Sequence, residues 1–538
     1  MRNFFAVSTH PNLKTQRSHL FEYVLAIILA TLIVNSLAHA LYHNWVFTTD
    51  DAYISWRYAE NFINGQGLRW YASNNPIEGY SNFSWVMLSA LTLKLGLPLL
   101  ETIKLFSTFS LFIALIALYA CARTFLSPLP ALLPVYLFSH YQGVIWWTVS
   151  GLETSFYLAL VFLLTWQSLR AFQWIPGAHS NKVEATIIAF YPRHWWIACA
   201  LLTLVALTRF EGAVFAVVLA GFTGCLRYKN AITASQCRKI ALIAFFAFII
   251  PYTIYFLWRL LYFGHIFPNS YLCKVTIDYY RFYLLRDYLL IAFPCFILSL
   301  PYLIGRIECR SILLWLPSLL YGVMLWRADP IIAHYNRLFL AAFGLLSLMT
   351  VLGIHKFFNY FCKQPLCNAL LSMFTVLIVT FLFIHANNPL TTQLAIEHYQ
   401  HRVNIRMQVA TLLNQKTAKN ARVLLSDCGV IPYLARADIE FIDSQCLNNR
   451  DLTSKEINLS YPKYARFLQN VVKPDWVVKN YYPKSQSEDD LTRIMAANGF
   501  FKDYDFVTTF QSHELGWENG KIVRKQPDQA YMIYKRRN

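Results

Sequence analysis

Residues 48–85 read TTDDAYISWRYAENFINGQGLRWYASNNPIEGYSNFSW and form the first long polar segment of an otherwise apolar chain. They follow an apolar run, at about residues 21–41, that is long enough to cross a membrane. Two adjacent carboxylates, Asp50 and Asp51, stand near the start of the segment, close to the point where this first helix would leave the bilayer. The segment is therefore predicted to form a loop at one face of a membrane, with acidic side chains at its beginning.

The composition predicts a mostly α-helical protein with many membrane spans. Of 538 residues, 56% are hydrophobic and only 14% are charged, which is typical of a polytopic membrane protein. The first apolar run is longer than a signal-peptide core and lacks a small-residue cleavage site, so it is predicted to be retained. Apolar runs bounded by polar breaks predict about eleven spans. They lie near residues 20–43, 101–122, 130–147, 152–170, 195–208, 211–226, 240–262, 287–305, 311–326, 338–355 and 369–386.

The formal charge of +18 indicates membrane topology rather than nucleic-acid binding. Basic residues gather at the ends of apolar runs, where they fix orientation and meet anionic headgroups. With the N-terminus in the cytoplasm, basic loops such as residues 227–239 fall on the cytoplasmic side, as the positive-inside rule requires. The same orientation brings carboxylates from distant segments to the exterior face. They are Asp50, Asp51, Glu60, Glu78, Glu153, Glu211, Asp278 and Asp329.

The chain is predicted to divide into a membrane module, residues 1–387, and an exterior soluble α/β domain, residues 388–538. The first exterior loop of the membrane module covers residues 44–100. The C-terminal part is polar and combines strand-like runs with amphipathic helical stretches. Its only cysteines, Cys428 and Cys446, would either pair as a disulfide in an oxidising exterior compartment or remain two free buried thiols.

Asp50 and Asp51 allow two interpretations. Adjacent carboxylates near a membrane interface repel one another, so one of them is expected to have a raised pKa, a bound cation or a positive partner. A general base that takes a proton from a hydroxyl group fits this description. The same Thr-Thr-Asp-Asp run also suits the N-cap of a helix that begins here. Both roles can hold together, with one residue capping and the other carboxylate facing a cavity.

Two motifs lie in residues 48–85, DDAYISWRYAENFINGQGLRW and PIEGYSNFSW. Further motifs follow them in order along nearly the whole chain. They are SGLETSFY at 150–157, LTRFEGAVF at 207–215, FPNSYLCK at 267–274, the segment from Arg327-Ala328-Asp329 to Arg337-Leu338-Phe339, and LLSDCGVIPYLARADIEFIDSQCLNNRDL at 424–452. Together they resemble a family of bacterial GT-C glycosyltransferases, the group that is similar to the mycobacterial terminal arabinofuranosyltransferase AftB.

The resemblance implies a GT-C fold in the bacterial inner membrane, with the C-terminal domain in the periplasm. It also implies transfer of a hexose or pentose from a polyprenyl-phosphate donor to an envelope glycan or lipid, for which lipopolysaccharide is a candidate. An acidic residue of the first loop, Asp50 or Asp51, takes the catalytic role. A departing phosphate needs cations, and we expect Arg209, Lys274 and Arg337 to hold it at the exterior boundary. Alternatively, each of these three snorkels to the interface or pairs with a neighbouring acid.

Further substrate-binding residues are predicted from the same motifs. They are Arg57, Glu78, Tyr80, Asn82, Glu153, Glu211, Asn269, Tyr271 and Asp329. The partners expected are the lipid-linked donor, the acceptor and membrane lipids. A donor embedded in the bilayer needs no nucleotide or organic cofactor, whereas the sequence leaves open a divalent metal, the sugar and the stereochemical outcome.

The alternative function is a sugar-lipid transporter or flippase, which many spans and intramembrane charges would also suit. The absence of a visible sequence repeat and the gathering of charges at one face favour the transferase.

Overall fold

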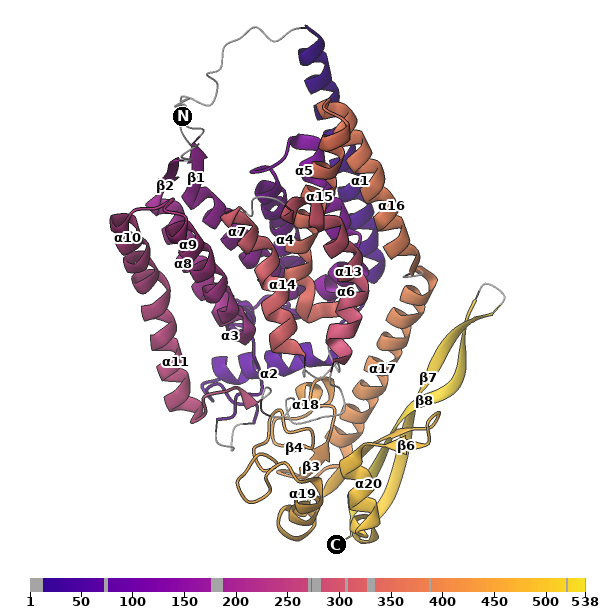
Figure 1. The fold of residues 1–538 in the computed structure, drawn as a ribbon. Coiled ribbons are helices and arrows are strands. Elements are labelled where there is room, and N and C mark those ends of the chain that lie inside the picture. Colours follow the sequence, from indigo (N-terminus) through magenta and orange to yellow (C-terminus); the bar gives the residue numbers. More distant parts are fainter. Residues whose placement is uncertain are drawn as a thin grey trace.

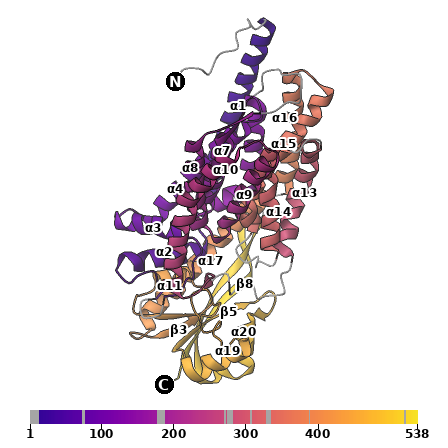
Figure 2. The same ribbon diagram turned by 60° about the vertical axis from the view of Figure 1, so that its left-hand side comes forward.

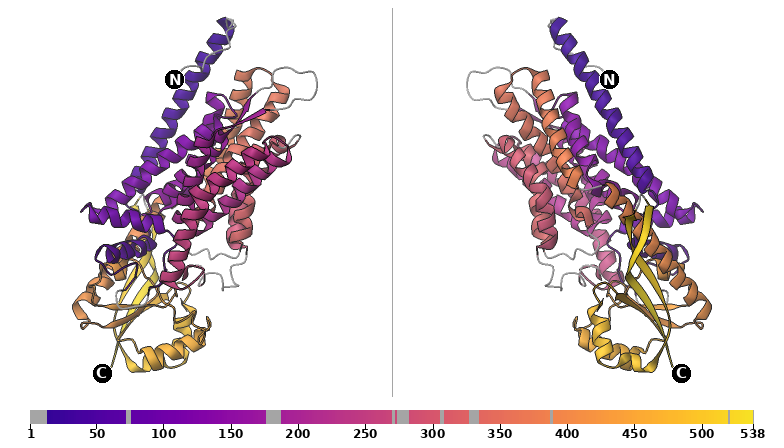
Figure 3. Two further views of the ribbon diagram at one scale, coloured as in Figure 1. Left: turned by 90° about the vertical axis from the view of Figure 1, so that its left-hand side faces the viewer. Right: turned by 90° about the vertical axis from the view of Figure 1, so that its right-hand side faces the viewer.

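The computed structural model describes residues 13–71, 76–175, 187–269, 272, 282–304, 308–326, 334–386, 389–518 and 521–537. A tall helical bundle makes up most of the molecule, and a smaller domain that contains a β-sheet closes one end of it (Figure 1). The first helix, α1 (Leu13–Asn44), runs along one edge of the bundle, and its N-terminal end projects beyond the opposite end (Figure 3). The predicted class, a helical membrane bundle followed by a mixed α/β domain, is therefore confirmed.

The bundle helices after the first exterior loop are mostly apolar. They are α4 (Leu99–Ala122), α5 (Pro128–Ser139), α6 (Gln142–Val149), α7 (Thr154–Ala171), α8 (Pro192–Thr208), α9 (Val214–Tyr228), α10 (Ala234–Ala244), α11 (Ile250–Phe263), α13 (Tyr283–Leu303), α14 (Ile312–Leu325), α15 (Leu340–Phe361) and α16 (Pro365–Ala386). Seven of the described helical segments are long and apolar enough to cross a membrane, or eight if the bent pair α6–α7 is counted as one span. A helix that is apolar all round belongs inside a bundle, and 89% of the residues in the apolar 18-residue window of α15 and the turn before it are buried.

One of the predicted spans is interrupted in the structure, whereas the break between the predicted spans 195–208 and 211–226 is present as expected. Residues 130–147 were expected to be continuous, but the helix ends at Ser139 and a new one, α6, starts at Gln142. Helix α6 then meets α7 at an angle of 119°. The break between α8 and α9 coincides with Gly212, where an added Cβ would lie 2.4 Å from the carbonyl oxygen of Val205. The turn between α6 and α7 carries Glu153, and the break between α8 and α9 carries Arg209 and Glu211.

The loop of residues 48–85 forms two helices, α2 (Asp50–Ile63) and α3 (Phe83–Lys94). Helix α2 lies across the end of the bundle, between the spans and the C-terminal domain (Figure 1). Its apolar side chains, including Ile54 and Tyr58, share one hydrophobic core with Val409 and Phe441 of the C-terminal domain. The first exterior loop therefore packs as the layer that joins the bundle to that domain.

The C-terminal domain contains a six-stranded mixed sheet. Its elements are α17 (Pro389–Lys416), β3 (Arg422–Leu425), α18 (Val430–Leu434), β4 (Glu440–Asp443), α19 (Tyr461–Phe467), β5 (Trp476–Tyr482), β6 (Ser487–Glu488), α20 (Asp490–Ala497), β7 (Tyr504–Glu518) and β8 (Lys521–Arg536). The strand order is β4-β3-β5-β8-β7, with β6 beside β5. Strands β4, β3 and β5 are parallel, whereas β8 and β7 are antiparallel to their neighbours. Helix α17 descends from the bundle along the β7–β8 hairpin (Figure 2).

A short antiparallel hairpin, β1 (Phe172–Ile175) with β2 (Ile187–Phe190), stands at the opposite end of the bundle. Both alternatives for Cys428 and Cys446, a disulfide between them or two free thiols, are wrong. Cys428 is a buried free thiol, whereas Cys446 is disulfide-bonded. The Cys428 thiol contacts the carbonyl oxygen of Ser426 over 3.4 Å instead.

Candidate active site

Helix α2 begins at Asp50 because the residue before it is held in an extended conformation by the turn between α6 and α7. The backbone N–H of Thr49 donates to the carbonyl oxygen of Ser150 over 3.0 Å. The next residue of that turn, Gly151, has a φ of +86°, and a Cβ there would lie 3.0 Å from the Cβ of Ala52. Glycine thus permits both the turn and its close approach to α2. Both aspartates are brought next to the start of α7.

Glu153, at the start of α7, is the centre of a buried polar cluster. Its Oε1 accepts a hydrogen bond from Nη2 of Arg337 at 2.8 Å and lies 3.4 Å from Nη1 of Arg209. Its Oε2 accepts from the side-chain amide of Asn82 at 2.9 Å, and the Asn82 oxygen accepts from the Ser55 hydroxyl of α2 at 3.1 Å. Only 4% of the Glu153 side chain is exposed. A carboxylate buried to this degree requires charged partners, and both arginines supply them.

Arg209 stands in the extended break between α8 and α9, with φ −148° and ψ 136°. Its Nη2 lies 2.5 Å from Oε1 of Glu211, so the predicted pairing with that neighbouring acid is present, with Glu153 as a second partner. The guanidinium is 5.4 Å from the ring centroid of Tyr157. The Tyr157 hydroxyl is 2.5 Å from that of Tyr321 on α14. These contacts fix Arg209 against α7 and α14.

Arg337 reaches the cluster through an irregular turn before α15. Tyr335 and Asn336 both adopt the left-handed conformation, with φ of 52° and 55°, which is uncommon for residues other than glycine. The Arg337 Nε donates to the Thr154 hydroxyl over 3.2 Å. Its guanidinium lies 4.9 Å from the ring centroid of Trp147. We define the Glu153 cluster as Glu153, Arg209, Arg337, Glu211 and Asn82.

Asp50 is engaged by the C-terminal domain. Its Oδ1 accepts from the backbone N–H of Val430 at 2.9 Å, and its Oδ2 accepts from that of Gly429 at 3.1 Å. The Nε of Arg406 lies 3.5 Å from the same Oδ1. Burial raises the pKa of Asp50 from 3.8 to about 6, although Arg406 acts in the opposite direction. Asp50 therefore caps α18 of the C-terminal domain as well as starting α2.

Asp51 has different surroundings. It is half-buried and lies within electrostatic range of the Arg337 guanidinium. Its charge also contributes to the raised pKa of Asp50. The two predicted catalytic candidates thus differ in their surroundings. Asp50 accepts hydrogen bonds from the C-terminal domain, whereas Asp51 is within electrostatic range of Arg337.

Two other predicted substrate-binding residues make contacts within the layer between the bundle and the C-terminal domain. The Arg57 Nε donates to the carbonyl oxygen of Trp70 over 2.7 Å, and its Nη1 donates to that of Pro432. Both carboxylate oxygens of Glu78 are held by Arg259 of α11, at 2.8 and 2.5 Å. Burial is the main cause that raises the pKa of Glu78, and Arg259 lowers it.

Tyr80 and Asn269 lie in the same layer. Tyr80 is buried against Tyr58 and Phe263, and its hydroxyl has no hydrogen-bond partner among the described residues. The Asn269 amide donates to the backbone carbonyls of Leu447 and Asn449 over 3.1 and 3.2 Å. Of the predicted set, Asn82, Glu153, Arg209, Glu211 and Arg337 come together. Lys274, Tyr271 and Asp329 lie outside the described residues.

Sequence reasoning missed Arg406, which joins the two domains. Its Nε donates to Oδ2 of Asp427 at 2.9 Å, and Asp427 also accepts from the Asn480 amide at 3.1 Å and from the Tyr531 hydroxyl. Arg406 is 8% exposed and stands on α17 three residues before the fully buried Val409. An arginine within the apolar stripe of an amphipathic helix was the available signal, because such a residue needs a buried partner.

An apolar groove of about 740 Å³ lies between α13, α14 and α15. It is lined by residues that include Leu285, Tyr288, Ser318, Gly322 and Trp326. The ring of Tyr288 stacks on Phe339, two residues after Arg337, at 4.2 Å between centroids. On α14, the lining residue Leu319 stands two positions before Tyr321. The Tyr321 hydroxyl contacts that of Tyr157, whose ring lies beside the Arg209 guanidinium. The groove is therefore next to the Glu153 cluster.

Among the described residues, no group of three or more acidic, histidine or cysteine side chains is placed to hold a metal ion.

The model of a domain of unknown function (DUF8728) matches residues 393–534, about a quarter of the chain. No curated protein sequence matches the chain. The structure is similar to the crystal structure of ArnT from Cupriavidus metallidurans bound to undecaprenyl phosphate. The TM-score is 0.54 and the identity 11%, over 94% of this chain and 97% of that one.

The structure is also similar to the crystal structure of an oligosaccharyltransferase from Archaeoglobus fulgidus in the apo form. Here the TM-score is 0.54 and the identity 13%, over 94% of this chain and 74% of that one. At such low identity the two comparisons establish the fold and nothing finer. The protein is therefore a multi-pass membrane protein with the fold of ArnT and the archaeal oligosaccharyltransferase, which is the GT-C fold that the sequence predicted.

Proposed function

We propose that the protein is a glycosyltransferase that moves a sugar from a polyprenyl-phosphate donor to a hydroxyl group of an envelope glycan or lipid. The observation that carries the proposal is the pairing of one buried carboxylate, Glu153, with the guanidinium groups of Arg337 and Arg209 beside the apolar groove of α13–α15. Asp51 lies within electrostatic range of Arg337. A base, two guanidinium groups and an apolar channel are the parts that such a reaction needs. The undecaprenyl phosphate bound to ArnT supports the same class of donor.

In the proposed step, the acceptor hydroxyl attacks the anomeric carbon of the donor sugar. Asp51 takes the hydroxyl proton, a new glycosidic bond forms, and the bond from the anomeric carbon to the phosphate oxygen breaks. The electron pair leaves with the phosphate, whose added charge Arg337 and Arg209 stabilise. A guanidinium carries five N–H donors, so each arginine can hold Glu153 and also reach a phosphate. Glu153 is thus a positioning residue for both.

Asp51 is favoured over Asp50 because it lies within electrostatic range of Arg337, whereas the Asp50 carboxylate accepts two backbone hydrogen bonds from the C-terminal domain. Lys274, Tyr271 and Asp329 remain candidates for donor and substrate contacts. We also propose substrate contacts for four residues of the layer between the bundle and the C-terminal domain, namely Arg57, Glu78, Tyr80 and Asn269. The groove of α13–α15 would take the polyprenyl tail.

The proposal places the protein in a bacterial inner membrane, with the N-terminus in the cytoplasm and the site at the periplasmic face. The distribution of basic loops supports this orientation. The narrower resemblance to AftB, and lipopolysaccharide as acceptor, are parts of the proposal that rest on sequence motifs alone. A sugar-lipid transporter without transferase activity is the competing function.

The deciding experiment compares envelope glycans and lipid A of a deletion strain with those of the same strain carrying the wild-type gene. We expect the deletion to remove one sugar residue, identified by its mass, and the wild-type gene to restore it. The Asp51→Asn gene, expressed and inserted at the wild-type level, should fail to restore it. If Asp50→Asn and Asp51→Asn proteins both restore full transfer, the mechanism is wrong. Movement of sugar-lipid across proteoliposomes without any transfer would establish the transporter instead.

A further inference from the structure

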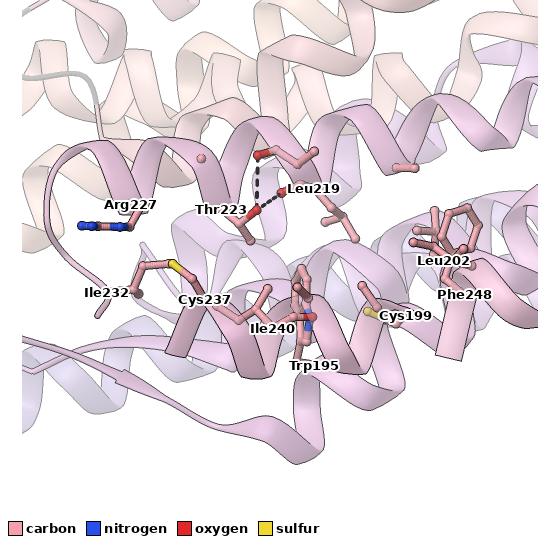
Figure 4. Close-up of a pocket in the computed structure, with 16 residues that line it drawn as sticks. Trp195, Cys199, Leu202, Leu219, Thr223, Arg227, Ile232, Cys237, Ile240 and Phe248 are labelled. Atoms are coloured by element: carbon pink, nitrogen blue, oxygen red, sulfur yellow. Dashed lines mark hydrogen bonds between the residues drawn. The ribbon is translucent and has the colours of Figure 1, made fainter. Parts of the chain in front are cut away.

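A second apolar groove lies in the half of the bundle that is far from the candidate active site. It has a volume of about 420 Å³ and is formed by α8, α9 and α10 together with the π-helical segment Phe245–Ile249 that continues α10 (Figure 4). Its lining is almost entirely apolar, with Trp195, Cys199, Leu202, Leu219, Ile240 and Phe248 among the side chains. A π-helical turn inside an α-helix is rare and is common at functional sites.

The open end of this groove is strongly basic. Arg227, which lines the groove, is exposed at the end of α9 and donates to the side chain of Asn230 over 3.1 Å. Lys229 follows in the turn, and Arg238 and Lys239 stand in the second turn of α10. The chain contains no acidic residue from position 212 to position 277. The groove thus joins an apolar channel to a cationic rim at one membrane face, the arrangement that an anionic lipid would match.

The length of the groove indicates the kind of lipid chain. Its lining residues on α10 and the π-helical segment run from Cys237 to Ile249, which is about 18 Å at 1.5 Å per residue. This is roughly one leaflet of a hydrocarbon core about 30 Å thick. The groove beside the Glu153 cluster runs from Leu285 to Leu303 on α13, about 27 Å, or nearly the whole core. The shorter groove suits one acyl chain of a diacyl phospholipid, whereas the longer one suits a polyprenyl tail.

We propose that the groove between α8, α9 and α10 binds an anionic phospholipid from the leaflet opposite to the candidate active site. One acyl chain occupies the apolar channel, and the phosphate lies at Arg227 and the basic turn that follows it. This site is separate from the proposed transferase site and does not depend on that function. Bound lipid would fill the space between α8, α9 and α10.

Two variants test the two halves of the site. Arg227→Gln combined with Lys229→Gln removes charge from the rim. Gly224→Phe fills the channel, because a Cβ at Gly224 would meet no atom within 4 Å. The matched controls are Lys363→Gln, which removes a basic residue elsewhere, and Val217→Phe, which adds a ring at an exposed position of α9 that does not line the groove. Each protein is reconstituted in nanodiscs of equal parts phosphatidylglycerol and phosphatidylethanolamine, and retained lipids are counted by native mass spectrometry after detergent release.

We expect the wild-type protein and both controls to retain one phosphatidylglycerol. Both groove variants should retain at least five-fold less, with correct insertion shown by an unchanged elution profile. Equal retention in all proteins would overturn the proposal. Equal retention of phosphatidylethanolamine would overturn the role of the basic rim, and replacement of the phospholipid by added undecaprenyl phosphate would overturn the identity of the occupant.

Discussion

The Nη2 of Arg337 lies 2.8 Å from Oε1 of Glu153, although 184 residues separate them in the chain. Arg209 approaches the same carboxylate oxygen at 3.4 Å. One buried carboxylate thus aligns two cations from different segments. Since both guanidinium groups would need to face the donor phosphate, their common partner sets the geometry of the proposed site.

Replacing Glu153 should destabilise the protein strongly. Glu153→Gln removes the charge that compensates two buried guanidinium groups, and loss of one partner from a buried ion pair costs about 3–5 kcal/mol. We expect a clearly lower thermal midpoint in detergent. The control is Glu308→Gln, whose pair with Arg310 is at the surface, where the Glu308 side chain is 44% exposed. That change should cost at most about 1 kcal/mol. Equal midpoints for both variants would contradict the central role of Glu153.

Asp51→Asn should abolish most of the transfer without unfolding the protein. A general base contributes about 10²–10⁴-fold to the rate, so kcat should fall within that range while KM for the donor changes little. Glu60→Gln, on the same helix, serves as the control and should keep the wild-type rate. Transfer from a radiolabelled polyprenyl-phosphate sugar in proteoliposomes measures both constants. A wild-type kcat for Asp51→Asn would exclude it as the base.

Asp50 should make stability depend on pH. Its pKa rises from 3.8 to about 6 on folding, mainly through burial, so the folded protein binds this proton more tightly than the unfolded chain does. The stabilising contribution is therefore complete below about pH 3.8 and is lost as the pH rises through about 6, with a total of about 3 kcal/mol. The stability of the wild type minus that of Asp50→Asn should fall from pH 4 to pH 7. A difference that is constant over this range would refute the assignment.

Gly429→Ala should loosen the C-terminal domain. An added Cβ would lie 2.0 Å from the backbone oxygen of Asp50, so α18 must move away from α2 at a cost of about 1–3 kcal/mol. Gly79→Ala should act similarly, because its Cβ would lie 2.0 Å from the Asn448 side chain. The control is Gly224→Ala, which meets no atom within 4 Å. Faster amide hydrogen exchange is expected in α18 of Gly429→Ala and around Asn448 of Gly79→Ala, and in neither place of the control.

Gly322→Phe should weaken binding of long-chain donors. Gly322 lines the groove of α13–α15, and a Cβ there already touches Leu285 at 3.5 Å. A ring at this position would exclude several methylene groups of a lipid tail, each worth about 0.8 kcal/mol. We expect KM for a long polyprenyl donor to rise about ten-fold or more, with little change for a donor of two isoprene units. Leu261→Phe, at a position 86% exposed, is the control.

The sequence predicted which residues meet at the Glu153 cluster because membrane topology alone orders the two faces of a bundle. Glu153, Arg209 and Arg337 each stand at the end of a span on the same side, so their convergence followed from the positive-inside rule. The choice between Asp50 and Asp51 could not be made in this way. It depends on Gly429 and Val430, about 380 residues away, whose backbone N–H groups donate hydrogen bonds to the Asp50 carboxylate.

Other differences arise from tertiary contacts or from local breaks that hydropathy does not detect. Residues 139–142 read SHYQ and carry no acidic or lysine/arginine side chain, so this short polar stretch was too weak a signal to divide residues 130–147 into α5 and α6. Glu78 is predicted to bind substrate because it stands among aromatic residues, and this stays a prediction. The sequence did not predict its ion pair with Arg259, which lies on a helix that sequence spacing could not pair with it.

The contact between Asp50 and α18 also changes how the C-terminal domain should be regarded. In open sheets with parallel strands, ligands bind outside the carboxyl ends of the strands where the strand order reverses. Strand β3 lies between β4 and β5, and Gly429 and Val430 follow its carboxyl end. The Asp50 carboxylate lies at this position and accepts hydrogen bonds from both backbone N–H groups. Because Asp50 is attached to α2, its local concentration is far above that of any free anion, so a free anion would compete poorly for these two groups.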